Sequence, residues 1–263
     1  MSAVKAQRCL RILLVEDNIV NQRVARALLE RGDHSIRIAE SGLAALAAHS
    51  EERFDLILMD VQMPEMGGFE ATAAIRERER ETGEHIPIIA MTARAMPGDR
   101  DECLAAGMDA YLAKPVRPGE LNAMIDQVMT GATADRATER PRQQSAAGAP
   151  AVDEKAFRAL LGNDDELISE IIALFLVEGP RLLAEVRAAV AAGEPNGLQR
   201  ASHALKGSVG NMAASRTVEA AHVLEIMGRD RRLDDAPRAL VVLEQELDHV
   251  MRALTGLIPA IPR

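Results

Sequence analysis

Short apolar runs alternate with helix-like segments over the first half of the chain, and this alternation restricts the possible folds more than any other feature. The apolar runs occupy residues 12–15, 36–39, 56–59, 86–91 and 110–113. The helix-like segments occupy residues 18–30, 41–48, 69–80, 99–105 and 118–129. Parallel strands need long crossover connections, which are usually helices. We therefore expect an α/β fold, a doubly wound (βα)5 parallel sheet with helices on both faces.

The second half of the chain shows helical periodicity and no strand signal. One apolar stripe comprises Leu167, Ile171, Leu174 and Val177, and another comprises Leu240, Leu243, Leu247, Val250 and Leu254. Steps of three and four residues are typical of a helix that packs lengthwise in a bundle. We expect Gly179 and Pro180 to kink or break the first of these helices. The sequence predicts an all-α region, an antiparallel helical bundle of the four-helix type.

Residues 130–151 separate these two patterns and read TGATADRATERPRQQSAAGAPA. Small and polar residues replace the apolar repeat there, so the segment cannot bury enough apolar surface to order itself. We expect a first domain over residues 9–130, a flexible linker over 131–151 and a helical bundle over 152–258. A chain of 263 residues is long enough for two such domains.

Charge and composition exclude several classes of partner. The formal net charge is −9 and aromatic residues make up 2% of the chain, which argues against binding to phosphate backbones and against base stacking. The longest apolar runs are far shorter than a membrane span. Two cysteines, Cys9 and Cys103, are too few for a disulfide framework. We expect a cytoplasmic protein with no nucleic-acid partner and no direct membrane insertion.

In an open parallel sheet, functional groups gather beyond the carboxyl ends of the strands. Here those ends carry three carboxylates, a hydroxyl and an ammonium, from Glu16, Asp17, Asp60, Thr92 and Lys114. Crowded carboxylates repel each other unless a cation lies among them, and oxygen ligands with room for water suit Mg²⁺. One carboxylate can then attack phosphorus and form an acyl phosphate. The pattern therefore predicts phosphoryl transfer.

Four segments of the first half extend this pattern, and they read LLVEDNIVNQ, LILMDVQMPEMGGFEAT, IIAMTARAM and GDRDECLAAGMDAYLAKP. Together, over about residues 10–129, they resemble the receiver domain of bacterial two-component response regulators, in the version attached to hybrid sensor kinases. The resemblance implies a flavodoxin-like sheet with strand order 2-1-3-4-5. One departure is Gly67-Gly68, where the family usually has Asp-Gly. We expect this change to alter the loop more than the chemistry.

The resemblance also implies roles for individual residues. By this similarity Asp60 is the phosphoacceptor, Thr92 and Lys114 contact the phosphoryl group, and Tyr111 is the switch aromatic. The bond between Lys114 and Pro115 is expected to be cis. The implied ligands of Mg²⁺ are Glu16, Asp17, Asp60 and the backbone carbonyl of Gln62.

Residues 196–213 of the second half read NGLQRASHALKGSVGNMA. Their expected buried stripe is Leu198, Ala201, Leu205, Val209 and Met212. At about 100° per residue, His203 lies far from the middle of this stripe, so we expect it to face outward with Gly207, and Lys206 to lie at its edge. A glycine inside a helix costs about 0.8–1.0 kcal/mol relative to alanine. Gly207 therefore indicates space kept open for a second protein to reach the imidazole.

The segment HALKGS, which begins at His203, resembles that of a histidine-containing phosphotransfer (HPt) domain, and the resemblance extends over about residues 152–257. It implies that His203 is the phosphorylated histidine and that Lys206 steadies the phosphoryl group. Gly207 and Ser208 are expected on the docking face. His222 and His249 have no flanking glycines and lysine, so we expect them to be ordinary surface or satisfied side chains.

The two resemblances together imply a phosphorelay protein. Asp60 is expected to receive a phosphoryl group from an upstream sensor histidine kinase with Mg²⁺, and to exchange it with His203 for transfer to the receiver of a downstream response regulator. The sequence has no Gly-rich nucleotide lid, so we expect no ATP-binding kinase domain within these residues. The kinase is then another protein, or a module of a hybrid sensor kinase whose C-terminal part is the present chain.

Two alternatives stay open on the sequence. A phosphohydrolase of the haloacid dehalogenase type also uses a strand-end Asp with Mg²⁺, but it places a second Asp two residues later, where this chain has Gln62. Without that acid and base, an acyl phosphate is expected to persist. A binding adaptor, by contrast, would use phosphorylation of Asp60 only to change its partner, with no relay through His203.

Overall fold

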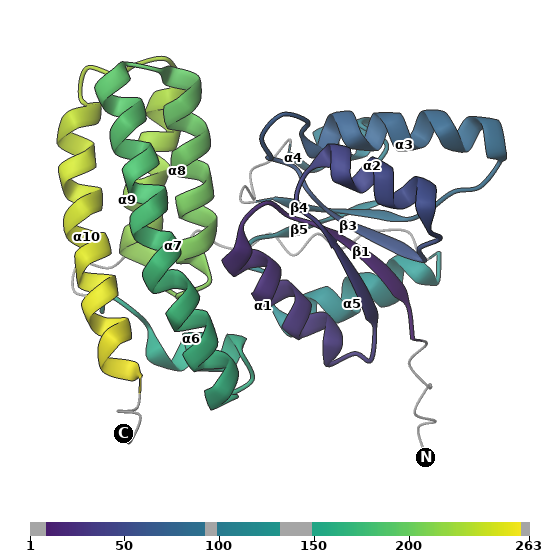
Figure 1. Ribbon diagram of the computed structural model, residues 1–263, viewed down its shortest axis with the longest axis horizontal. Helices are drawn as coiled ribbons and strands as arrows, with labels where there is room; N and C mark the ends of the chain where they lie inside the picture. The colour runs from purple at the N-terminus through teal and green to yellow at the C-terminus, as the bar shows by residue number, and fades with distance from the viewer. Residues whose placement is uncertain (1–8, 93–98, 132–148, 259–263) are drawn as a thin grey trace. The chain divides into compact units, whose positions relative to one another are not determined.

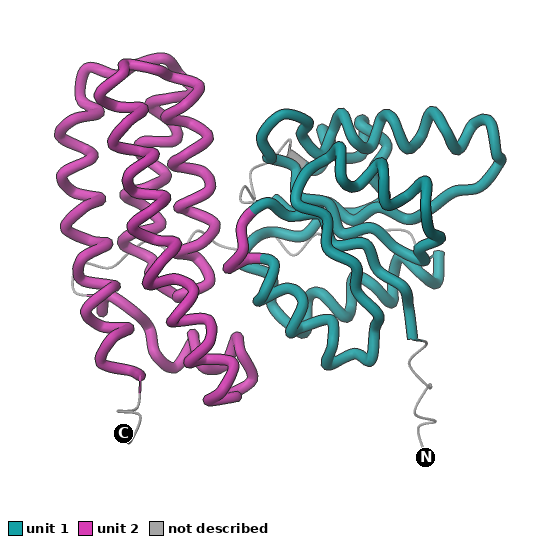
Figure 2. The backbone as a smooth tube through the Cα atoms, viewed as in Figure 1, with its two compact units in different colours: residues 1–17, 22–140 teal, residues 18–21, 141–263 magenta. Residues whose placement is uncertain are grey.

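The structure is a computed structural model that describes residues 9–92, 99–131 and 149–258. The chain divides into two compact units, residues 1–17 with 22–140 and residues 18–21 with 141–263 (Figure 2). The predicted linker lies outside the described residues except at its two ends. The domain bounds 9–130 and 152–258 therefore stay predictions.

The first unit contains a five-stranded parallel sheet. Its strands are β1 (Arg11–Val15), β2 (Ser35–Ala39), β3 (Leu56–Asp60), β4 (Ile88–Thr92) and β5 (Ala110–Ala113). They lie in the order β2-β1-β3-β4-β5, which confirms the predicted fold class and strand order. In register, Val15 pairs with Met59 and Asp60 pairs with Met91, so the carboxyl ends of the central strands finish at the same edge.

Among the described residues, five helices cover this sheet. They are α1 (Ile19–Glu30), α2 (Gly42–Glu51), α3 (Gly68–Thr82), α4 (Asp99–Ala105) and α5 (Pro118–Met129). Helices α1 and α5 lie on one face, and α2, α3 and α4 lie on the other (Figure 1). All five residues of β3 are buried because helices cover both faces of this central strand.

The elements of the second unit from residue 154 onward are all helices. These are α6 (Glu154–Leu160), α7 (Asp165–Ala192), α8 (Pro195–Gly210), α9 (Ser215–Arg229) and α10 (Ala236–Leu257). Helix α7 packs on α8, α8 on α9, α9 on α10 and α10 on α7, so the four longer helices surround one core (Figure 1). This arrangement confirms the predicted helical bundle, to which α6 adds a short helix that we did not predict.

The apolar stripes of α8 and α10 are confirmed but for Leu240, which is half-buried. Leu198, Ala201, Leu205 and Val209 of α8 are buried, as are Met212 just after it and Leu243, Leu247, Val250 and Leu254 of α10. On α7, Val177 is 74% exposed, so its place in the stripe is wrong. The reason is that Phe175 is buried, and residues two apart on a helix lie about 200° apart around its axis.

Helix α7 also runs without a break through Gly179 and Pro180, which differs from our expectation. Pro180 is exposed. Phe175 and Leu182, which lie about two helical turns apart on either side of it, are both buried in the core. Burial of apolar side chains on both sides of the proline holds the two halves of the helix against the same core. This packing offsets the lost backbone hydrogen bond, which costs about 3 kcal/mol.

Gly228 lets α9 approach the start of α8 closely. A Cβ atom added to Gly228 lies 2.5 Å from the backbone nitrogen of Gln199 and 2.7 Å from the carbonyl oxygen of Pro195. Because backbone would have to shift, we expect Gly228→Ala to lower the free energy of unfolding of the bundle by about 1–3 kcal/mol. Urea unfolding followed by circular dichroism measures this.

The matched control is Gly256→Ala on α10, where an added Cβ meets nothing within 4 Å. This substitution removes a glycine from a helix, so we expect it to raise the free energy of unfolding by up to about 1 kcal/mol. If both variants unfold at the same urea concentration, close packing at Gly228 does not limit the bundle.

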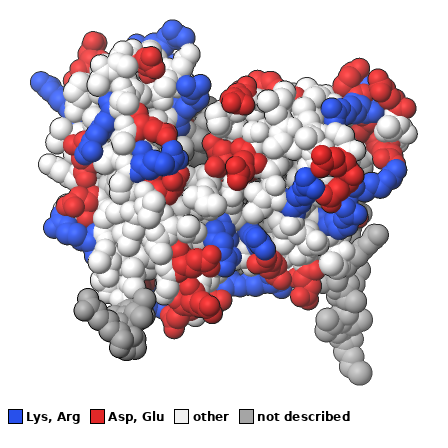
Figure 3. Space-filling view, viewed as in Figure 1, with Lys and Arg blue, Asp and Glu red and all other residues white. Residues whose placement is uncertain are grey.

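Acidic and basic side chains are interspersed on the face that Figure 3 shows. Within the described ranges, no helix combines the length and the apolar character needed to cross a membrane. The cytoplasmic compartment and the lack of a nucleic-acid partner stay predictions from charge and composition.

Candidate functional site

Three carboxylates meet at the carboxyl edge of the sheet, and we call this group the acidic pocket. Glu16 and Asp17 follow β1, and Asp60 is the last residue of β3. One carboxylate oxygen from each lies within 4.8 Å of one from each of the others. Glu16 is 1% exposed and Asp60 is 2% exposed, so two of the three charges are almost removed from water. The sheet thus brings together the carboxylates that the sequence predicted.

Lys114 places its ammonium group inside the acidic pocket. It follows β5, and its Nζ donates to Oε2 of Glu16 at 2.5 Å and to Oδ2 of Asp60 at 2.7 Å. Burial alone would lower the pKa of Lys114, but the charges of Asp60 and Glu16 outweigh it and raise this pKa above its usual range. Lys114 is therefore a permanent positive charge between two of the carboxylates.

The backbone around Asp60 fixes the position of its side chain. The N–H of Gln62 donates to Oδ1 of Asp60 at 3.2 Å, while Oδ2 accepts from Lys114. A Cβ atom added to Gly68 would lie 2.2 Å from the carbonyl oxygen of Asp60, so only glycine permits this approach of the α3 start. Both carboxylate oxygens of Asp60 are thus oriented by neighbours.

The remaining predicted residues of the first unit lie close to this edge in the fold. Thr92 is the last residue of β4, is 7% exposed, and its carbonyl oxygen accepts the N–H of Lys114 at 2.7 Å. Tyr111 lies on β5 and packs against the core cluster beneath α2 and α3. The bond between Lys114 and Pro115 is cis, as expected. The roles of Gln62 as a metal ligand and of Tyr111 as a switch stay predictions.

The donor set of the acidic pocket fits a hard divalent cation. All three groups offer carboxylate oxygens, which Mg²⁺ prefers, and sulfur or imidazole ligands are absent from the group. Their three negative charges exceed the single positive charge of Lys114. A cation beside them would relieve the repulsion that burial strengthens. Glu16, Asp17 and Asp60 could therefore hold Mg²⁺.

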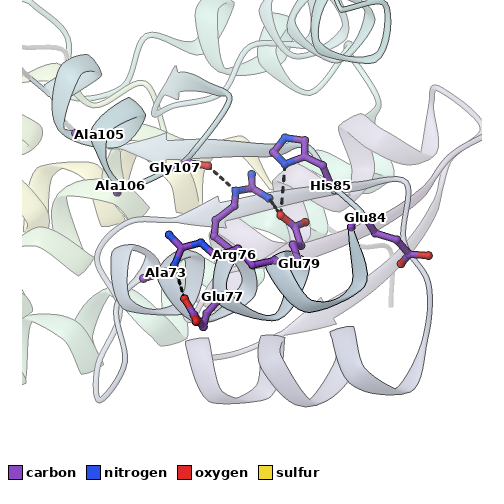
Figure 4. Close-up of a pocket in the computed structure, with 11 residues that line it drawn as sticks. Ala73, Arg76, Glu77, Glu79, Glu84, His85, Ala105, Ala106 and Gly107 are labelled. Carbon is purple, nitrogen blue, oxygen red and sulfur yellow. Dashed lines mark hydrogen bonds and ion pairs between the residues drawn. The ribbon is translucent and has the colours of Figure 1, made fainter.

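A second polar cluster lies at the opposite edge of the sheet, before β4 and β5, and lines a hollow (Figure 4). Arg76 of α3 donates to Glu79 at 2.7 Å, to the carbonyl oxygen of Gly107 at 2.7 Å and to Asp109 at 2.8 Å. His85 lies 2.8 Å from Asp109. Because these groups satisfy one another and tie α3 to both strand starts, we interpret the cluster as structural.

In the second unit, His203 of α8 faces a carboxylate on the neighbouring helix. Its Nδ1 lies 2.7 Å from Oε1 of Glu225 on α9. A carboxylate only accepts, so Nδ1 carries the proton and Nε2 keeps the lone pair. The imidazole of His203, which we expected to face outward, contacts α9 through Glu225.

Glu225 also accepts from Lys206 and His222 through its second oxygen. Lys206 Nζ lies 2.5 Å and His222 Nδ1 lies 3.0 Å from Oε2. Burial opposes ionisation of Glu225, but hydrogen bonds from His203 and His222 and the charge of Lys206 hold its pKa far below the usual range. We call Glu225 and its three donors the carboxylate cluster. Its ionised form stabilises the bundle above the pKa of an unfolded glutamate, and this contribution shrinks as pH falls below it.

The sequence did not single out Glu225 or the contact of His222. The histidine and the glutamate are three residues apart in the sequence, which places them on one face once the segment is a helix. What the sequence could not show is which face of α9 meets α8. Ser208, predicted on the docking face, has a fully buried side chain, and its hydroxyl has no hydrogen-bond partner among the described residues.

Family models match both units. Residues 12–126 match the response regulator receiver domain, and residues 170–253 match the Hpt domain. The first match contains the acidic pocket and Lys114. The second contains all four members of the carboxylate cluster.

Similar proteins are histidine kinases. Sensor histidine kinase GacS of Pseudomonas protegens is 32% identical over 257 residues, which cover 95% of this chain and 27% of that protein. Hybrid signal transduction histidine kinase I of Dictyostelium discoideum is 45% identical over 121 residues, which cover 44% of this chain and 7% of that protein. This chain therefore spans 27% or less of the length of these two relatives.

Among solved structures, the receiver domain of sensor histidine kinase PA1611 from Pseudomonas aeruginosa PAO1 is 41% identical. It was solved with a magnesium ion in its active-site cleft. The match covers 47% of this chain and 99% of that chain, with a TM-score of 0.43. From the two family-model matches, the chain belongs to the two-component signalling proteins, as a response regulator receiver domain followed by an Hpt domain.

Proposed function

We propose that this chain is a phosphorelay intermediate that carries a phosphoryl group on Asp60 and on His203. The observation that carries the proposal is the acidic pocket with Lys114 inside it, because this arrangement neutralises charge where a phosphoryl group would sit. The imidazole of His203, held at Nδ1 by Glu225, supplies a second acceptor. The donor is an upstream sensor histidine kinase, and the final acceptor is the receiver of a downstream response regulator.

The first transfer takes place at Asp60. A carboxylate oxygen of Asp60 attacks the phosphorus of a phosphohistidine on the kinase, and a phosphorus–oxygen bond forms. The nitrogen–phosphorus bond breaks, and its electron pair returns to the departing imidazole. Lys114, already bonded to Asp60, offers its charge to the phosphoryl oxygens, and the hydroxyl of Thr92 is proposed to donate to one of them.

Glu16, Asp17 and Asp60 are the residues proposed to hold Mg²⁺, with the backbone carbonyl of Gln62. When bound, this ion would neutralise negative charge on the phosphoryl oxygens. Orientation of Asp60 does not depend on it, because Gln62 N–H and Lys114 hold the two oxygens of this carboxylate.

The second transfer uses His203. Its Nε2 lone pair attacks the phosphorus of an aspartyl phosphate, the new bond is nitrogen–phosphorus, and the carboxylate of the aspartate leaves. Nδ1 keeps its proton, and Glu225 stabilises the positive charge that develops on the ring. Lys206 is proposed to steady the phosphoryl oxygens. The reverse reaction uses the same groups, so the structure permits flow in either direction.

The matches support a relay, and they support neither of the two alternatives. A dehalogenase-type hydrolase needs a carboxylate two residues after the nucleophile as acid and base. Here that residue is Gln62, which has no carboxylate and contributes its backbone N–H to Asp60. Labelled acetyl phosphate with Mg²⁺ tests the proposal directly: label should appear on Asp60 and then on His203, whereas continuous release of phosphate from small esters would indicate a hydrolase.

Removal of the metal should stop the first transfer, and removal of one ligand should weaken it. We expect Glu16→Gln to raise the Mg²⁺ concentration for half-maximal phosphorylation by at least about tenfold, because one buried charged ligand is lost. Chelation with EDTA should abolish labelling of the unaltered chain. A Mg²⁺ titration of acetyl phosphate labelling measures both effects.

Glu30→Gln is the matched control, since Glu30 lies on α1 with 44% of its side chain exposed and pairs with Arg26. It should leave the Mg²⁺ dependence unchanged. An unchanged dependence in Glu16→Gln as well would show that Glu16 does not bind the ion.

A further inference from the structure

One carboxylate, Glu225, contacts two histidines. His203 lies at Oε1, and His222 lies at Oε2 together with Lys206. The relay chemistry uses His203 and Lys206, and it gives His222 no role. His222 nevertheless binds the same buried group that orients the nucleophile.

The two oxygens of Glu225 share a single negative charge. Its side chain is 1% exposed, so water does little to screen what happens at either oxygen. A stronger positive charge at Oε2 leaves less negative charge at Oε1, and the hydrogen bond to Nδ1 of His203 then weakens. Nucleophilicity at Nε2 falls with it, because the Nδ1–H to carboxylate bond is what raises the electron density of the ring.

His222 can deliver such a change. Its side chain is 28% exposed, whereas that of His203 is 8% exposed, so solvent protons reach His222 more readily. Histidine changes charge within the physiological pH range. Protonated His222 would place a full positive charge 3.0 Å from Oε2, where the neutral ring offers only an N–H dipole.

We infer that His222 is a positioning residue that acts through Glu225 and makes phosphoryl transfer to His203 sensitive to pH. The inference rests on the proposed function, since it concerns the rate of that transfer. The charged group that contacts His222 is Glu225 on its own helix, and Lys206 and His203 on α8 contact the same carboxylate. Among the described residues, no charged side chain of α7 or α10 takes part in these hydrogen bonds.

The sign of the effect follows from these contacts. While the ring of His222 is neutral, this ring and an uncharged amide are equivalent donors to Oε2. As pH falls, only the histidine gains charge, so the unaltered chain loses nucleophilicity at His203 and the chain with His222→Asn does not. The ratio of the two rates therefore changes with pH, although each rate alone depends on pH for other reasons.

The test uses full chains in two roles. The donor is the His203→Gln chain, phosphorylated on Asp60 by acetyl phosphate and Mg²⁺ and then freed of reagent. The acceptors are the Asp60→Asn chain with and without His222→Asn, and acid-labile label on His203 is followed between pH 5.5 and 8.5. Because the donor is the same in both arms, its own pH dependence cancels in the ratio of rates.

We expect the His222→Asn acceptor to match the unaltered acceptor at pH 8 and to react on the order of threefold faster at pH 6, the size expected for weakening one charged hydrogen bond. In ¹⁵N spectra recorded over the same pH range, the ring nitrogens of His203 should show a pH-dependent shift in the unaltered acceptor that is lost in the variant. His249→Asn, on α10 and 3.9 Å from Glu246, should give a flat ratio.

A flat ratio for His222→Asn would overturn the inference and leave the relay intact. If neither acceptor is labelled, and none of the label moves within the unaltered chain, the proposed function itself fails. His222→Gln repeats the test with a longer amide, and thermal unfolding of both variants confirms that the bundle is folded. Loss of the bundle in both variants would also contradict a role limited to positioning.

Discussion

Asp60→Asn should prevent labelling of the receiver by acetyl phosphate, with a fall in rate of at least about a hundredfold. The amide has nearly the same shape as the carboxylate, and Gln62 and Lys114 still surround it. It lacks the negatively charged oxygen that attacks phosphorus, so no acyl phosphate forms. Labelled acetyl phosphate, Mg²⁺ and a gel run near neutral pH measure the loss.

Asp126→Asn is the matched control for this experiment. Asp126 is an exposed residue of α5 that does not belong to the acidic pocket, and its replacement removes the same charge. It should label like the unaltered chain. If Asp60→Asn still accepts label at the normal rate, the phosphoacceptor is another residue and the assignment of this pocket is wrong.

His203→Gln should separate the two acceptors. We expect Asp60 to be labelled as before, while alkali-stable label on the bundle is lost and transfer to a downstream receiver falls by at least about a hundredfold. Glutamine fills the space beside Glu225 and Lys206 but has no ring nitrogen with a free lone pair. Chemical stability distinguishes the two products, because acyl phosphates hydrolyse in alkali and phosphohistidine hydrolyses in acid.

His249→Gln is the control here, since His249 lies on α10 with 46% of its side chain exposed. It should relay normally. If output survives in His203→Gln, the chain acts as an adaptor controlled by Asp60 alone. In the unaltered chain, a transfer rate independent of protein concentration would indicate that Asp60 passes its phosphoryl group within one molecule, whereas a rate proportional to concentration would indicate transfer between molecules.

The sequence predicted the sheet and the acidic pocket well because their signals are local. An unbroken apolar run such as that of β3 occurs where helices cover a strand on both faces, and Asp60 closes that run. Parallel strands then bring their carboxyl ends to one edge, so residues far apart in the chain meet without any further information. Lys114 contacts Glu16 and Asp60 for this reason.

The bundle was harder to predict because the sequence does not show which face of one helix packs against which face of the next. Periodicity placed Leu205 and Val209 in the core, but it could not show that α9 turns Glu225 toward His203. The wrong expectation for Val177 has the same origin, since two neighbouring stripes on α7 fit the sequence almost equally. Pro180 did not break α7, because apolar side chains on both sides of it pack into the core. This packing acts only once the bundle is assembled.

The contact between Lys114 and Glu16 joins residues 98 positions apart in the sequence. The acidic pocket and the Lys114 inside it thus draw on the segment after β1, the end of β3 and the segment after β5, and none of these alone holds more than part of the arrangement. During synthesis, a ribosome that has released only the first four strands presents carboxylates without their ammonium partner. If Asp60 is the phosphoacceptor proposed above, the pocket is complete only after the last strand joins the sheet, and phosphorylation then indicates that the whole receiver has folded.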